Sequence, residues 1–108
     1  MRYSIDIDGV ISKKLIWTPR DSYLRLRKML LYIKTNKEVI KRINKLYREG
    51  HVIILNTSRI WNDYDVTIEW LKKHKVKYHQ LIMAKPLCDV YVDDKNISVE
   101  EFLKWKYY

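Results

Sequence analysis

Apolar and polar residues alternate from Arg2 to Ile7, and Gly9 ends the pattern. A two-residue period of this kind predicts a β-strand with one buried face. The segment from His51 to Thr57 has a continuous apolar centre, VIIL, which is typical of a strand inside a parallel sheet. Shorter apolar runs at Leu81–Met83 and Val90–Val92 predict two further strands.

Apolar residues that recur with the 3.6-residue period predict helices between these strands. One helix is expected from Asn36 to Glu49, where Gly50 follows as a left-handed stop. A second helix is expected from Tyr64 to His74. A last helix opens at Ser98, which forms a capping box with the glutamate three positions later, and runs through Trp105.

This alternation of strands and helices predicts an α/β fold: a three-layer α/β/α, Rossmann-like sandwich with a mainly parallel sheet. The 108 residues suit one domain over positions 1–108. Ligands of such sheets bind beyond the carboxyl ends of the strands. The residues after Ile7, Leu55, Met83 and Val92 are therefore expected to converge on one crevice.

Composition and charge narrow the functional classes. Lys and Arg number 22 against 13 Asp and Glu, and the net charge of +9 attracts polyanions and phosphorylated small molecules alike. A basic surface that serves only solubility fits equally well. No apolar run approaches the ~20 residues that a membrane span needs, and the single Cys88 cannot form an internal disulfide. We therefore expect a cytoplasmic protein.

Polar side chains suited to phosphoryl transfer follow the four predicted strands. Crowded carboxylates repel one another and need a cation, and hard oxygen ligands with room for water suit Mg²⁺. A carboxylate can also act as the nucleophile, and fixed donors stabilise the charge that develops on the transferred phosphoryl group. The candidates are Asp6, Asp8, Gly9, Thr57, Ser58, Arg59, Lys85, Asp93 and Asp94.

These segments resemble the four motifs of the haloacid dehalogenase-like (HAD) superfamily of phosphatases. SIDIDGV at 4–10 resembles the first motif, an apolar strand that ends in Asp-x-Asp-Gly. IILNTSR at 53–59 resembles the second, Lys85-Pro86 the third, and VYVDD at 90–94 the fourth. Their order and spacing also agree, and the resemblance covers roughly residues 2–11 and 36–103. It is strongest to small members without a cap domain.

The resemblance implies a Mg²⁺-dependent phosphomonoester hydrolase with an aspartyl-phosphate intermediate. By it, Asp6 is the nucleophile and a metal ligand, and Asp8 is the general acid and base and a metal ligand through its backbone carbonyl. Thr57 and Lys85 hold the phosphate, and Asp93, with Asp94 behind it, completes the metal site. Further phosphate-binding candidates are Gly9, Ser58 and Arg59, although Arg59 is equally suited to capping the next helix.

Three positions depart from the family pattern. Val10 stands where Thr is commoner, Asn56 where an apolar residue is usual, and Ala84 where small members often have Gly. None of these changes removes a reacting group. Ala84 is expected to restrict the backbone before Lys85.

Residues 12–35 resemble the family least and mix basic with aromatic and aliphatic residues. The segment is too short for a true cap domain, so we expect a flap and a helix that pack on the core and expose a basic face. Nucleic-acid binding, a membrane-surface helix and a dimer contact are the alternatives.

The substrate expected for this open, basic site is a small phosphorylated metabolite such as a nucleotide or a sugar phosphate. Two alternatives are a phosphatase acting on nucleic-acid ends and a non-catalytic HAD-like binding protein. Trp61, Trp70 and Trp105 are expected to pack in the core or between helices rather than to act as stacking platforms.

Overall fold

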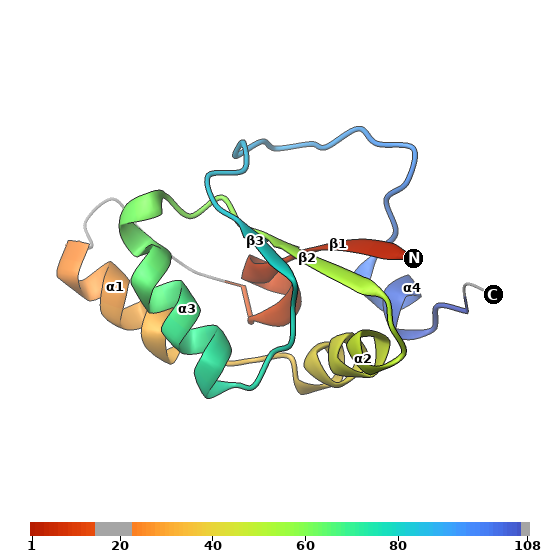
Figure 1. Ribbon diagram of the computed structural model, residues 1–108. Coiled ribbons are helices and arrows are strands. Elements are labelled where there is room, and N and C mark those ends of the chain that lie inside the picture. Colours follow the sequence, from red (N-terminus) through yellow and green to blue (C-terminus); the bar gives the residue numbers. More distant parts are fainter. Residues whose placement is uncertain (15–22, 107–108) are drawn as a thin grey trace.

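Three parallel strands form the centre of the fold in the computed structural model, which describes residues 1–14 and 23–106 (Figure 1). Their order across the sheet is β1-β2-β3, and Ile5 lies opposite Leu55, which in turn lies opposite Leu81. The predicted α/β class and parallel sheet are confirmed. The strands are β1 (Arg2–Asp6), β2 (Val52–Asn56) and β3 (Gln80–Ile82).

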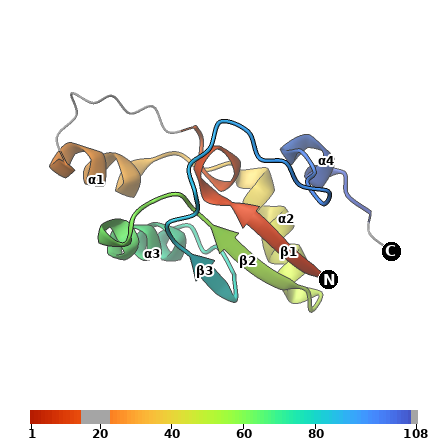
Figure 2. The same cartoon turned by 90° about the horizontal axis from the view of Figure 1, so that it is seen from above.

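The helices lie below the sheet in Figure 1, and α4 lies beyond β1 in the view from above (Figure 2). As the sequence predicts, a helix begins near Asn36 and leads into β2, another joins β2 to β3, and a last one follows near the C-terminus. None of the helices in the described ranges is long and apolar enough to cross a membrane. The helices are α1 (Tyr23–Tyr32), α2 (Lys37–Arg48), α3 (Tyr64–Lys73) and α4 (Val99–Leu103), with short turns η1 (Ile7–Ile11) and η2 (Trp61–Asp63).

Local sequence accounts for where these helices pack and begin. Val39, Ile43 and Leu46 are all buried on one face of α2, while the lysines of that helix face outward. The predicted capping box opens α4, because the Ser98 hydroxyl accepts a hydrogen bond from the backbone N–H of Glu101 at 3.0 Å.

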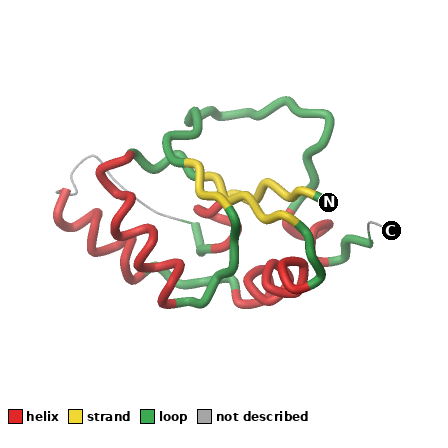
Figure 3. Tube along the Cα trace, in the orientation of Figure 1, coloured by secondary structure: helices red, strands yellow, loops and turns green. Residues whose placement is uncertain are grey.

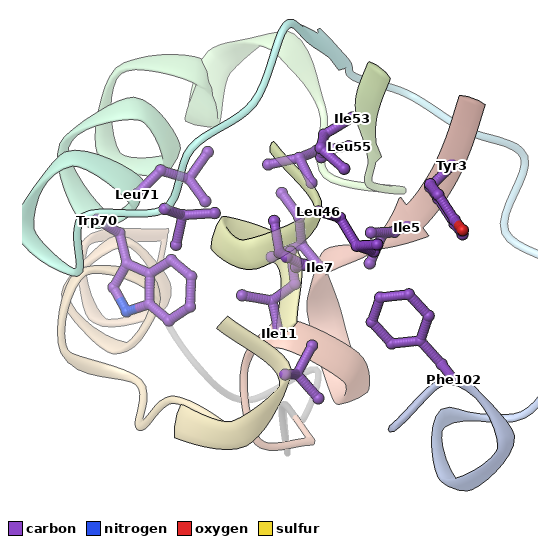
Figure 4. Close-up of a cluster of buried hydrophobic side chains, with 13 residues drawn as sticks. Tyr3, Ile5, Ile7, Ile11, Leu46, Ile53, Leu55, Trp70, Leu71 and Phe102 are labelled. Carbon is purple, nitrogen blue, oxygen red and sulfur yellow. The ribbon is translucent and has the colours of Figure 1, made fainter. Parts of the chain in front are cut away.

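The core lies between the sheet and the helices (Figure 4). Ile53 and Leu55 of β2 meet Trp70 and Leu71 of α3, and all four are fully buried. The Trp70 indole N–H donates to the backbone carbonyl of Ile33 at 2.8 Å, which satisfies its polar atom inside the core. The expected packing role is confirmed for Trp70.

The two ends of the segment 12–35 lie side by side at the edge of the core. Ser12 and Thr35 form an isolated antiparallel bridge, and Asn36 donates to the Val10 carbonyl at 2.6 Å. Between them α1 packs beside α3, with Leu30 buried and Arg27 paired with Asp65. The expected helix that packs on the core is confirmed; the part of the flap at 15–22 lies outside the described residues.

The predicted fourth strand at Val90–Val92 is absent, which corrects the sequence prediction. The segment between β3 and α4 is a loop that arches over the sheet (Figure 3), and the side chains of Val90 and Val92 are 74% and 97% exposed. Strand β1 has β2 as its neighbour and lies at the edge of the described sheet. Pairing with β1 would bring Asp93 toward Asp6, and repulsion between uncompensated carboxylates opposes that arrangement.

Candidate active site

The carboxyl ends of β1, β2 and β3 bring three predicted site residues to one edge of the sheet. Asp6 ends β1, and Thr57 follows β2. The backbone N–H of Thr57 donates to Ile82 at 3.0 Å, and its carbonyl accepts from the N–H of Lys85 at 2.9 Å. The charge of Lys85 also acts on Asp6. The expected convergence of the strand ends is therefore confirmed for Asp6, Thr57 and Lys85.

Asp8 lies at the same edge and is held by two side chains from the β2 end. The Thr57 hydroxyl donates to one carboxylate oxygen at 3.1 Å. The Arg59 Nη2 donates to the other oxygen at 2.7 Å, and its Nε donates to both oxygens, at 3.2 Å each. Gly9 next to it has a φ of +82°, which a residue with a side chain adopts only at a cost, so glycine sets the turn that presents Asp8.

Arg59 is 7% exposed and belongs to a hydrogen-bonded network behind Asp8. Its Nη1 donates to the Thr67 hydroxyl at 3.1 Å, and that hydroxyl donates to the Asp63 carbonyl at 2.7 Å. The Arg59 guanidinium therefore binds Asp8 in this structure, whereas the sequence suggested that it binds phosphate or caps a helix. Thr67 was missed, and its only signal was a hydroxyl on the apolar face of a helix beside Trp70.

Asp6 differs from Asp8 in its surroundings. Burial raises the pKa of Asp6 above the usual carboxyl range, and the charge of Asp8 adds to this, whereas Lys85 and a backbone hydrogen bond oppose it. Asp6 makes no ion pair within 4 Å with any residue of the described ranges. A half-buried carboxylate without a bound guanidinium is available to attack phosphorus or to bind a cation.

The remaining predicted site residues lie outside this cluster or beside it. Ser58 is half-buried between Thr57 and Arg59, and the Lys85 ammonium lies over the ring of Tyr91, 4.3 Å from its centroid. Asp93 and Asp94 are exposed in the arched loop, where Asp93 accepts a hydrogen bond from the N–H of Lys95 at 2.8 Å.

The described residues contain no group of three or more His, Cys, Asp or Glu side chains placed to hold a metal ion. The Asp6 carboxylate and the backbone carbonyl of Asp8 nevertheless suit Mg²⁺ chemically, since this ion commonly takes one or two carboxylates together with water and substrate phosphate oxygens. The absence of an ion pair to Asp6 among residues 1–14 and 23–106 is the observation that favours such a fit.

Comparison with known proteins adds a likeness of fold. No protein-family model matches the sequence, and no curated protein sequence matches it. A crystal structure of a target protein from Vibrio cholerae superposes with a TM-score of 0.74 at 22% identity, over 97% of this chain and 89% of the other. The predicted Rossmann-like α/β fold is thereby confirmed.

Two further solved structures are similar to this chain. One is a chain in the Pnkp1/Rnl/Hen1 complex, with a TM-score of 0.61, 25% identity and 95% of this chain covered. The other is a chain in the Pnkp1/Rnl/Hen1 RNA repair complex, with a TM-score of 0.60, 20% identity and the same coverage. This protein spans only 34% and 30% of those two chains.

Proposed function

We propose that the protein is a Mg²⁺-dependent phosphomonoester hydrolase that uses Asp6 as its nucleophile. The observation that carries the proposal is a grouping at one sheet edge. It consists of Asp6, which has no ion pair within the described part of the chain, Asp8, which is held in place by Thr57 and Arg59, and the ammonium of Lys85. A nucleophile, a proton carrier and fixed donors are the groups that phosphoryl transfer requires.

In the first step a carboxylate oxygen of Asp6 forms a bond to phosphorus while the ester P–O bond breaks. The electron pair of that bond goes to the leaving oxygen. This oxygen takes a proton from Asp8, which must first be protonated as substrate binding loosens its ion pair with Arg59. In the second step water attacks the phosphorus of the aspartyl-phosphate and gives a proton to Asp8. The bond between phosphorus and the Asp6 oxygen breaks, so inorganic phosphate leaves and the Asp6 carboxylate is restored. Lys85 donates to the phosphoryl oxygens throughout, and the Thr57 hydroxyl joins it once substrate binding has turned that hydroxyl away from Asp8.

Bound Mg²⁺ would neutralise charge on the phosphoryl group and on the carboxylates. The residues proposed to hold it are Asp6, the backbone carbonyl of Asp8, and Asp93, with Asp94 next to it. Because Asp93 is exposed in the arched loop, we propose that metal binding is coupled to a change in the position of that loop. Neutralised carboxylates no longer oppose the approach of Asp93 to β1.

The test is phosphate release from a panel of nucleotides, sugar phosphates and phosphorylated oligonucleotides, with Mg²⁺ and with a chelator. Asp6→Asn removes the proposed nucleophile. Asp89→Asn is the matched control, since Asp89 is an exposed aspartate outside the site. Turnover that needs Mg²⁺ and is lost only in Asp6→Asn supports the proposal. Folded protein without turnover on any member would favour the non-catalytic binding protein instead.

A phosphatase acting on nucleic-acid ends is the second candidate, and the surface of α2 favours it. A cavity of about 360 Å³ there is lined by Glu38, Lys41, Arg42, Lys45 and Leu103. The likeness to a chain in an RNA repair complex points the same way.

Phosphate contacts along a strand make affinity fall steeply with salt. For an oligonucleotide, Lys41→Gln combined with Lys45→Gln should weaken binding and reduce its salt dependence. Lys72→Gln, at an exposed position on α3, should leave both unchanged. Equal effects of salt on a mononucleotide and an oligonucleotide would favour a small metabolite.

A further inference from the structure

Two large aromatic side chains are exposed where the chain leaves the candidate active site. Trp61 in η2 is 63% exposed, and Tyr64 at the start of α3 is 43% exposed. Their ring centroids are 5.7 Å apart, and their planes are tilted by 35°. The expectation that Trp61 packs in the core or between helices is therefore wrong, because this indole remains largely in contact with solvent.

The position of this pair is tied to Asp8. Trp61 follows Arg59 by two residues, which limits the separation of their Cα atoms to about 7 Å. Arg59 binds Asp8 directly, and Thr67 links the guanidinium to the carbonyl of Asp63, the last residue of η2. Buried hydrogen bonds thus hold the aromatic turn at a set place relative to the phosphoryl-transfer groups.

We propose that Trp61 and Tyr64 form a stacking platform for the base of a phosphorylated nucleoside whose phosphate lies beside Asp6. Every nucleobase has a flat aromatic face, and stacking on protein aromatics tolerates differences in base identity. The net charge of +9 draws such anionic substrates toward the protein. This inference rests on the proposed function and narrows its substrate class to nucleotides, either free or at the end of a strand.

The surroundings of the platform favour a base over other apolar ligands. Ile60 beside it is 53% exposed, so the apolar surface continues on the same turn. Across η2, Arg27 donates to the Asn62 carbonyl at 2.8 Å and pairs with Asp65 at 2.6 Å, which places a cation near the turn. An exposed aromatic pair beside a phosphate site matches the two parts of a nucleotide, the base and the phosphate.

The test compares a nucleoside monophosphate with ribose 5-phosphate, which has the same phosphoester but no base. Loss of stacking in Trp61→Ala should lower kcat/KM for the nucleotide by about 5- to 150-fold and leave that for ribose 5-phosphate unchanged. Trp61→Phe should retain most of the activity. Tyr32→Ala, which removes an aromatic side chain of the same 63% exposure from α1, should change neither value.

A phosphorylated oligonucleotide forms the third arm of the assay and separates the two sources of the base. An effect of Trp61→Ala on both nucleotide and oligonucleotide assigns the platform to any nucleotide, and an effect on the oligonucleotide alone assigns it to strand ends. Should Trp61→Ala fail to fold by circular dichroism, Tyr64→Ala tests the same platform from its other ring.

Binding to Asp6→Asn, measured by calorimetry, separates failure of the platform from failure of the proposed function. Normal turnover with no effect of Trp61→Ala or Tyr64→Ala would overturn the platform and leave the hydrolase standing. If there is no turnover, but the nucleotide binds more tightly than ribose 5-phosphate, the platform alone is supported. This preference must then be lost when Trp61→Ala is combined with Asp6→Asn. Equal losses for the nucleotide and ribose 5-phosphate would overturn it.

Discussion

Replacing Arg59 with methionine tests the network that holds Asp8. Methionine has a similar length and stays apolar, so the change removes the guanidinium without opening a large void. The variant loses the ion pair to Asp8 at 2.7 Å and the hydrogen bond to Thr67 at 3.1 Å. Thr67 keeps its bond to the Asp63 carbonyl, so the main damage falls on Asp8.

The size of the effect follows from how deeply the pair is buried. The side chain of Arg59 is 4% exposed and that of Asp8 is 26% exposed. Breaking a fully buried pair costs about 3–5 kcal/mol. Because water still reaches Asp8 and Thr57 still donates to it, we expect about 2–4 kcal/mol. For a domain of this size that loss lowers Tm by roughly 10–20 °C.

The assay is urea and thermal unfolding of wild type, Arg59→Met, Asp8→Asn and the double variant. The pair should show a coupling energy of about 1–3 kcal/mol. Glu100→Gln is the matched control, since its pair with Lys104 has side chains 81% and 77% exposed and should matter by less than about 0.5 kcal/mol. A cost for Arg59→Met below about 1 kcal/mol, or costs that simply add, would refute the reasoning.

Three other predictions concern backbone strain, the ionisation of Asp6 and the arched loop. Ala84 and Lys75 have φ values of +60° and +56°, which favour glycine. Ala84→Gly and Lys75→Gly should therefore each raise the free energy of unfolding by about 0.5–1 kcal/mol in urea unfolding. A loss of stability would contradict this. Burial raises the pKa of Asp6, so ionisation of this carboxyl opposes folding as pH rises through that pKa. Without metal, Asp6→Asn should therefore have a higher Tm than wild type near neutral pH. The difference should vanish in acid, below the ordinary carboxyl pKa. Mg²⁺ should slow hydrogen exchange at Val90–Val92 in wild type but not in Asp93→Asn, and identical exchange with and without the ion would count against a metal-coupled loop.

The spacing of apolar residues in the sequence was enough to predict the first three strands and the helices before β2 and β3. The residue types at Ser98 and Glu101 were enough to predict the capping box. Each of these depends on residues close together in the chain, where propensity and burial favour the same structure. The grouping of Asp6, Thr57 and Lys85 was also predictable, because the carboxyl ends of parallel strands always share one edge of the sheet.

Only the tertiary structure decided which partners these residues have. A short apolar run such as Val90–Val92 has the same pattern whether it pairs or stays exposed, and its neighbour in space and the charges beside it decide between the two. Arg59 binds Asp8, 51 positions away, and no local period carries that information. Trp61 is exposed because the turn after β2 leaves the core, whereas Trp70, nine residues on, is buried by α3. Pairing, burial and ion-pair choice are three-dimensional properties, and the free energy of the packed chain selects them.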